Sequence, residues 1–200
     1  AHYHSQSPEA YFAHTPGLVV AMPRSPIQAK GLLMSCIRSN DPCIFFEPKA
    51  LYRLAEEEVP VEDYEIPLGK AEVLTEGSDV TLIAYGLQMR HARMAAKMAE
   101  DHGISVEVID LRTILPWDED TVMASVKKTG RAIIYQEDSL FGGIASDISS
   151  LIMENCFEYL DAPIKRVGSL ETPIPFAKSL EKNYLPIDRL YKEIQELLNY

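Results

Sequence analysis

Two hundred residues are enough to form one large domain or two small ones with a substantial hydrophobic core. The hydrophobic fraction of 46% and the charged fraction of 24% are typical of ordinary soluble globular proteins. The net charge is −11, with 5 basic against 9 acidic residues in 1–65 and 14 against 21 in 66–200. Nucleic acids and anionic membranes both require positive potential, so the charge argues against either as a partner. It is compatible with a solvated acidic surface or with a basic protein partner.

The cysteines and the apolar runs exclude further classes. Cys36, Cys43 and Cys156 are odd in number, far apart and embedded in apolar runs, which predicts buried free thiols in a reducing compartment. No uninterrupted apolar stretch approaches the roughly 20 residues that span a bilayer. The chain opens at Ala1 inside what looks like a structured segment, which indicates truncation or processing at that point.

Short helices and apolar strands alternate in the first part of the chain. The pairs Ser7-Pro8 and Ser25-Pro26 each predict a helix start, with serine as the cap and proline at the first helical position. Continuous apolar runs predict strands that are covered on both faces. The expected elements are a helix from Ser7 to about His14, a strand over 18–22, a helix from Ser25 to Ile37 and a strand over 43–46.

An acidic stretch with little periodicity, 54–67, separates this part from the rest and predicts a linker between domains. Beyond it, strands alternate with helices, which indicates right-handed crossovers and a mostly parallel sheet covered on both faces. The expected strands are 80–85, 106–111, 132–136 and 164–167, and the expected helices are 88–102, 118–128, 143–156 and 187–198.

His4 is the first candidate for chemistry. It directly precedes a predicted helix in a loop rich in hydrogen-bonding side chains, where an imidazole can exchange a proton near neutral pH. A loop histidine that is bonded only to its neighbours fits the same local sequence. His2 has the same ambiguity with less support, and His14 is expected at a helix terminus.

Three other segments allow binding sites as well as purely structural roles. Carbonyl oxygens at the helix end over 36–41 can ligate a hard cation, although most helix ends bond water or a cap. Gly142-Gly143 can hold an anion at a helix N-terminus, or form a tight, closely packed turn. Asp110 and Arg112 lie at the carboxyl end of a predicted strand, where α/β sheets place function, but Arg112 can also pair with Asp110 or another carboxylate.

A series of motifs in order resembles the β subunit of 2-oxo acid dehydrogenases, the E1 component, over nearly the whole chain. The motif Phe46-Glu47-Pro48-Lys49 is most similar to that of the branched-chain 2-oxo acid enzyme. A pyruvate-specific or broad bacterial relative is the second most similar. The matching segments are Tyr3-His4-Ser5-Gln6-Ser7-Pro8-Glu9, His14-Thr15-Pro16-Gly17-Leu18, Pro23-Arg24-Ser25-Pro26, Phe45-Phe46-Glu47-Pro48-Lys49, Leu51-Tyr52-Arg53, Asp79-Val80-Thr81-Leu82, Val108-Ile109-Asp110-Leu111-Arg112-Thr113, Pro116-Trp117-Asp118 and Thr172-Pro173.

The resemblance implies an α/β fold in two parts. Residues 1–60 would be the C-terminal half of a thiamine-diphosphate pyrimidine-binding domain and 61–70 the linker. Residues 71–200 would be a mostly parallel domain of the transketolase C-terminal type.

It also implies a function. Family members are α2β2 tetramers that hold thiamine diphosphate with Mg²⁺ between the E1 α and β subunits, decarboxylate a 2-oxo acid and acylate the lipoyl group of E2. His4 matches the active-site histidine and is expected to be the catalytic acid or base. Main-chain oxygens of Cys36, Ser39 and Asp41 match a potassium site, although Ser39 and Asp41 depart from the human-type side chains.

Docking and location follow from the same resemblance. The acidic C-terminal domain, ending at Tyr200, matches the part that docks the basic subunit-binding domain of E2. The expected location is the mitochondrial matrix in a eukaryote and the cytoplasm in a bacterium.

Two anchors of the cofactor are missing. The glutamate that activates the aminopyrimidine would lie upstream of Ala1, and no Gly-Asp-Gly segment for magnesium diphosphate occurs. We therefore expect these 200 residues to be inactive alone. The alternatives are a pyruvate dehydrogenase E1 β subunit and a non-catalytic α/β module for assembly or docking.

Overall fold

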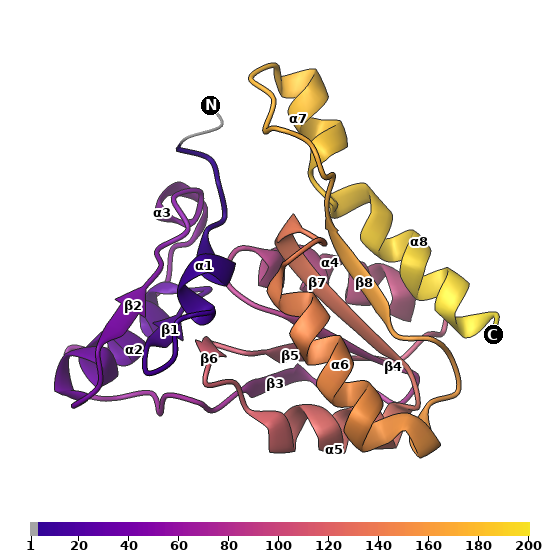
Figure 1. The fold of residues 1–200 in the computed structure, drawn as a ribbon, viewed down its shortest axis with the longest axis horizontal. Helices are drawn as coiled ribbons and strands as arrows, with labels where there is room; N and C mark the ends of the chain where they lie inside the picture. Colours follow the sequence, from indigo (N-terminus) through magenta and orange to yellow (C-terminus); the bar gives the residue numbers. More distant parts are fainter. Residues whose placement is uncertain (1–3) are drawn as a thin grey trace.

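The computed structural model describes residues 4–200, so His2 lies outside the described residues. Its strands form two sheets, with orders β2-β1-β6 and β3-β5-β4-β7-β8 (Figure 1). The strands are β1 (Val19–Ala21), β2 (Cys43–Phe45), β3 (Glu72–Thr75), β4 (Val80–Ala84), β5 (Val106–Asp110), β6 (Thr113–Leu115), β7 (Ala132–Ser139) and β8 (Lys165–Ser169). The α-helices are α1 (Glu9–Ala13), α2 (Pro26–Arg38), α3 (Leu51–Leu54), α4 (Gln88–Glu100), α5 (Glu119–Thr129), α6 (Ile144–Cys156), α7 (Lys178–Tyr184) and α8 (Ile187–Leu198), and a 3-10 turn covers Phe157–Tyr159.

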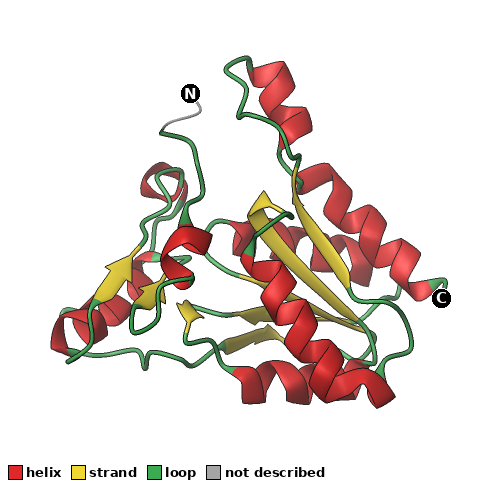
Figure 2. Cartoon of the chain, in the orientation of Figure 1, coloured by secondary structure: helices red, strands yellow, loops and turns green. Residues whose placement is uncertain are grey.

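The larger sheet has the predicted parallel core. β5, β4, β7 and β8 pair in parallel, and only the edge strand β3 runs antiparallel, to β5. Helices lie on both faces of this sheet (Figure 2), with α4 and α8 on one face and α5 and α6 on the other. The sequence predicted the strands β4, β5, β7 and β8, because short runs rich in apolar residues alternate there with predicted helices.

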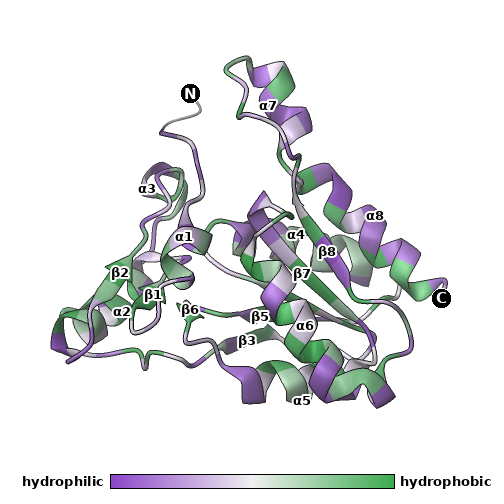
Figure 3. Ribbon diagram, viewed as in Figure 1, coloured by the Kyte–Doolittle hydropathy of each residue, from purple (hydrophilic) through white to green (hydrophobic). Residues whose placement is uncertain are grey.

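Alternate residues of the central strands supply two different cores. Leu82 and Ile133 face α4 and α8, whereas their neighbours Ile83 and Ile134 face α5 and α6. This two-residue period follows from the pleat of a strand. Hydrophobic colouring accordingly follows the central strands and the sheet-facing sides of the helices (Figure 3).

The two sheets are joined through β6 and a shared core. β6 follows β5 in the chain but pairs antiparallel with β1 of the smaller sheet. Val20 and Met22, in and just after β1, lie in the same hydrophobic core as Ile83 and Ile134 of the larger sheet. A displacement of one sheet relative to the other would therefore disturb a common core.

The segment that connects α3 to β3 contains no helix or strand, yet it packs closely along α2. The Tyr64 hydroxyl donates to the carbonyl of Ile27 at 2.8 Å, and the Ser35 hydroxyl donates to the carbonyl of Ile66 at 2.6 Å. Arg38 forms ion pairs with Asp63 and Glu65, both at 2.6 Å. The acidic residues of this segment thus pair partly with basic residues of α2. The domain boundaries over 60–71 stay a prediction.

Three features differ from the expectations from sequence. Ser7 does not cap α1: its N-cap is Pro8, without a side-chain cap, and the Ser7 hydroxyl donates to Glu137 instead. β2 is half-buried because it lies at the edge of its sheet, and Cys36 and Cys43 are also only half-buried. The short elements β3, β6, α3 and α7 were not predicted, because segments of three to seven residues show too little periodicity.

Candidate active site

His4 lies at a cleft of about 590 Å³ between the first residues of the chain and the C-terminal part. One wall comes from the segment 4–9 and from residues 46–50, which follow β2. The opposite wall comes from the start of α4, from Glu137 on β7 and from the α7 region. In Figure 1 this is the region between the N-terminal segment and α7. The N-terminal part with the smaller sheet and the part built on the larger sheet, called the larger domain below, therefore both contribute to the surroundings of His4.

The segment that carries His4 is held by hydrogen bonds to the larger domain. The Ser7 hydroxyl donates to Oε1 of Glu137 at 2.9 Å. The side-chain amide of Gln88, which is almost fully buried, donates to Oε2 of the same carboxylate at 2.9 Å. Glu137 thus links the loop before α1 to the first turn of α4.

Glu9 forms a second and deeper link. Its side chain is 1% exposed, and its Oε1 accepts a hydrogen bond of 2.9 Å from the hydroxyl of the buried Tyr85. Oε2 is buried and has no hydrogen-bond partner among the described residues. Burial raises the pKa of Glu9 to about 7, against the opposing effect of hydrogen bonds from its own backbone and Tyr85. Glu9 is therefore partly protonated near neutral pH.

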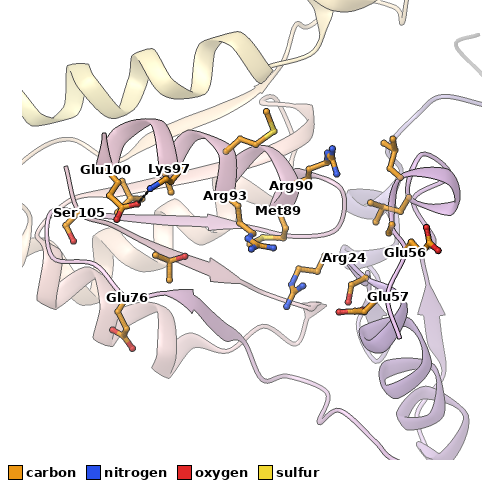
Figure 4. Close-up of a pocket in the computed structure, with 18 of the residues that line it drawn as sticks. Arg24, Glu56, Glu57, Glu76, Met89, Arg90, Arg93, Lys97, Glu100 and Ser105 are labelled. Carbon is orange, nitrogen blue, oxygen red and sulfur yellow. Dashed lines mark hydrogen bonds and ion pairs between the residues drawn. The ribbon is translucent and has the colours of Figure 1, made fainter. Parts of the chain in front are cut away.

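A larger cavity of about 950 Å³ lies elsewhere, between α4 and the segment after α3 (Figure 4). Figure 4 shows Arg90 and Arg93 of α4 with Arg24 on one side, and Glu56 and Glu57 on the other. None of the residues predicted to be catalytic or to bind metal lines this cavity. Its mixed charges do not single out one class of ligand, so the candidate active site is the cleft at His4.

The predicted potassium residues lie together at the C-terminal end of α2. Ser39 is the C-cap, and its hydroxyl accepts a hydrogen bond of 3.1 Å from the backbone N–H of Asp41. Burial and the neighbouring Cys43 raise the pKa of the Cys36 thiol to about 12, so near neutral pH it is not a thiolate ligand. Among residues 4–200, no group of three or more His, Cys, Asp and Glu side chains could hold a metal ion. Main-chain oxygens are thus the remaining donors for a cation at this turn.

Gly142-Gly143 forms a closely packed turn, one of the two predicted alternatives. A Cβ atom on Gly143 would lie 2.1 Å from Nε2 of Gln136 and 2.5 Å from the carbonyl oxygen of Ser139. The buried Gln136 also accepts a hydrogen bond of 2.7 Å from the backbone N–H of Ala145, in the first turn of α6. A side chain therefore takes one of the donors that an anion would need.

Asp110 and Arg112 belong to a charged cluster at the junction of the sheets. The buried Asp110 lies 2.9 Å from Nε of Arg24 and accepts a hydrogen bond of 2.9 Å from Gln28. Arg112 pairs with Glu72, which also pairs with Arg24 at 3.0 Å. Burial raises the pKa of Asp110 to about 6 despite these partners. The cluster connects α2 to the larger sheet, away from the cleft at His4.

The other singled-out residues lie away from this cleft. His14 is the C-cap of α1, as expected. The ring of His102 contacts the Tyr191 hydroxyl at 3.0 Å, just beyond α4. Tyr200 is exposed after α8, on the larger domain.

Sequence reasoning did not find the residues that hold His4 in place. Glu137, Gln88 and Tyr85 are 49 to 130 positions away from their partners, and they belong to no short motif. The one available signal was Glu137 itself, an acidic residue near the carboxyl end of a predicted buried strand.

Two family models match the chain: the transketolase pyrimidine-binding domain over residues 1–55 and the transketolase C-terminal domain over 69–189. A solved split-gene transketolase, described as an inactive β4 tetramer, superposes with a TM-score of 0.78 at 26% identity. That likeness covers 99% of this chain and 63% of the other.

Two curated relatives narrow the family further. The mitochondrial 2-oxoisovalerate dehydrogenase subunit beta of Dictyostelium discoideum is 59% identical over 92% of this chain and 50% of its own length. The pyruvate dehydrogenase E1 component subunit beta of Staphylococcus epidermidis is 46% identical over 92% and 56%. The chain thus spans about half the length of these relatives. It belongs to the transketolase family, and over most of its length it is similar to the β subunits of 2-oxo acid dehydrogenases.

Proposed function

We propose that this chain forms the β side of an E1 active site that decarboxylates a branched-chain 2-oxo acid and passes the acyl group to the lipoyl group of E2. The observation that carries the proposal is the position of His4, at a cleft built by both domains and on a loop that is hydrogen-bonded to the larger domain. The higher identity to the 2-oxoisovalerate enzyme than to the pyruvate enzyme, 59% against 46%, supports the branched-chain substrate.

The residues around His4 fit the reacting end of thiamine diphosphate but not its diphosphate end. Glu47, Glu137 and Glu181 line the cleft against one lysine, Lys49, so it would repel a diphosphate. The sequence has no Gly-Asp-Gly segment either. We therefore assign the magnesium diphosphate to a partner α subunit, as in an α2β2 enzyme.

In this role the chain would handle protons and shape the site. The bound cofactor would supply the carbanion chemistry that releases CO2. His4 would hold or deliver a proton at an imidazole nitrogen, a task suited to a side chain that changes charge near neutral pH. Phe46, Leu87 and Ile174 line the cleft and would limit the access of water.

The remaining assignments follow the family. Main-chain oxygens of Cys36, Ser39 and Asp41 would bind K⁺, and the acidic C-terminal domain with Tyr200 would dock E2. Among residues 4–200, no helix is long and apolar enough to cross a membrane. The mitochondrial label of the Dictyostelium relative supports a matrix location for a eukaryotic source, and the bacterial relative supports a cytoplasmic one for a bacterial source.

CO2 release from 2-oxoisovalerate and from pyruvate, by the β subunit assembled with α, tests the proposal. We expect kcat/KM to be at least about 10-fold higher for 2-oxoisovalerate, because a pocket shaped for a branched chain loses apolar contacts with a smaller substrate. His4→Ala should lower kcat by about 10²- to 10⁴-fold, as removal of a general acid or base does.

His102→Ala, a histidine outside the cleft, is the matched control and should keep the normal rate. A preference for pyruvate would favour the second candidate, a pyruvate dehydrogenase subunit. An unchanged rate in His4→Ala would favour the non-catalytic docking module.

A further inference from the structure

The loop before α1 carries His4 at an exposed position, and the helix that follows the loop is short. His4, Ser5 and Gln6 are exposed, and α1 contains only five residues. Pro8, its N-cap, provides no side-chain cap. A proton-transfer group must nevertheless lie within hydrogen-bond reach of the reacting atom. Contacts from outside the loop can set that position.

Among the residues that the structure describes, two side chains of the larger domain hold this loop and the start of α1. Tyr85, directly after β4, donates to the buried Glu9, and this bond holds the first turn of α1. Glu137, on β7, accepts from Ser7, only three residues after His4. Of these two carboxylates, Glu137 is the partly exposed one, and it acts on the residue nearer to His4.

The Glu137 carboxylate is itself held in a fixed orientation. Oε2 accepts from the Gln88 amide, which is 3% exposed, so Oε1 is presented to the Ser7 hydroxyl. A carboxylate with both oxygens engaged has little freedom to rotate. Gln88 begins α4, and Glu137 lies on the neighbouring part of the central sheet, so both belong to the rigid part of the larger domain.

We propose that Glu137 is a positioning residue for His4, which it places at the cleft by accepting the Ser7 hydroxyl bond across the domain boundary. This inference rests on the proposed function of His4. It gives the larger domain a part in the reaction although none of its residues donates the proton. Removal of Glu137 would free the loop at Ser7 while Tyr85 still holds Glu9.

A double-mutant cycle in the assembled enzyme tests the proposal. Glu137→Ala should lower kcat by about 10- to 100-fold with a smaller change in KM, because misplacement of a reacting group by about 1 Å costs rate more than binding. In a His4→Ala background the same substitution should change kcat by less than about 2-fold, since the group that it positions is gone. Multiplicative effects of the two substitutions would overturn the inference.

Ser7 provides an independent variant that leaves β7 intact. Ser7→Ala should reproduce the loss in kcat, and Ser7→Thr, which keeps the hydroxyl, should restore most of it. Glu154→Ala, an exposed glutamate of α6, is the matched control and should keep the normal rate. A normal kcat in Ser7→Ala, or an equal loss in Ser7→Thr and Ser7→Ala, would contradict the role of this bond.

These variants distinguish a wrong catalytic role for His4 from a wrong positioning role for Glu137. If His4→Ala has the normal rate, the proposed function of His4 is wrong, and Glu137 has nothing to position. If His4→Ala is slow but Glu137→Ala and Ser7→Ala are normal, the function stands and the inference fails.

Discussion

At the residue scale, stability should depend on pH through Glu9, whose carboxyl group accepts a hydrogen bond from Tyr85 and has one oxygen without a partner among residues 4–200. The pKa of Glu9 is raised by burial from 4.5 to about 7. The folded state therefore binds this proton more tightly than the unfolded chain does. Its contribution to stability is complete below about pH 4.5 and declines as the pH rises through about 7.

Glu9→Gln should remove this pH dependence. Glutamine stays neutral and keeps a carbonyl oxygen for Tyr85, so the variant should gain stability relative to wild type by about 3 kcal/mol between pH 4.5 and 8. Denaturant unfolding of both proteins across this range measures the difference. Asp110 titrates in both proteins, so the difference isolates Glu9. A difference that does not vary with pH would show that Glu9 is ionised in the folded protein at pH 5.

The residues of the loop at the cleft could be considered from sequence, whereas their hydrogen-bond partner in the larger domain could not. His4 was a candidate from its local sequence, an imidazole in a polar loop before a helix, and the family resemblance supplied its expected catalytic role, which stays a prediction. Ser7 was wrongly predicted to cap α1, since local rules count only neighbours in the chain. Its actual partner, Glu137, is 130 residues away, and that pairing depends on how the two domains meet.

The connecting segment after α3 packs so closely on α2 that it limits the size of the side chain at position 31. A Cβ atom on Gly31 would lie 2.7 Å from Cγ1 of Ile66 and 2.8 Å from Cε2 of Tyr64. Glycine is costly in a helix by about 1 kcal/mol relative to alanine. Its presence here is explained by the close approach of the connecting segment.

Gly31→Ala should therefore lower the free energy of unfolding by about 1–2 kcal/mol, because overpacking outweighs the gain in helix propensity. Chemical denaturation measures the change. In an Ile66→Ala background, which removes the side-chain atoms of Ile66 but leaves Tyr64, the cost should shrink in part. A stabilising Gly31→Ala would mean that the segment does not pack on α2 as described.

Long apolar strands and periodic helices could be predicted, whereas short elements could not. β4 and β5 are buried along their whole length, and most of their residues are apolar. β6 is three residues long and pairs with β1, more than ninety residues earlier in the chain. Its place depends on docking of the two domains, for which a single sequence carries no periodic signal.

For the whole molecule, the domains form one continuous structure through β6 and the shared core, with the cleft at their junction. The family and fold class could be inferred from an ordered series of motifs. The roles of the larger domain at His4 and of the charged cluster around Asp110 required the structure, because both combine residues from separate elements.

On the proposed function, the cleft would hold only part of thiamine diphosphate, so activity should depend on assembly with an α subunit. The central claim is that these residues supply a proton-transfer group but not the diphosphate anchor. The most direct measurement compares CO2 release from 2-oxoisovalerate, with thiamine diphosphate and Mg²⁺, by this 200-residue chain alone and by the β subunit that contains it assembled with α. This division of the site between the chain and its partner predicts no turnover by the chain alone and turnover by the assembly. Turnover by the chain alone, or none by the correctly assembled enzyme, would contradict it.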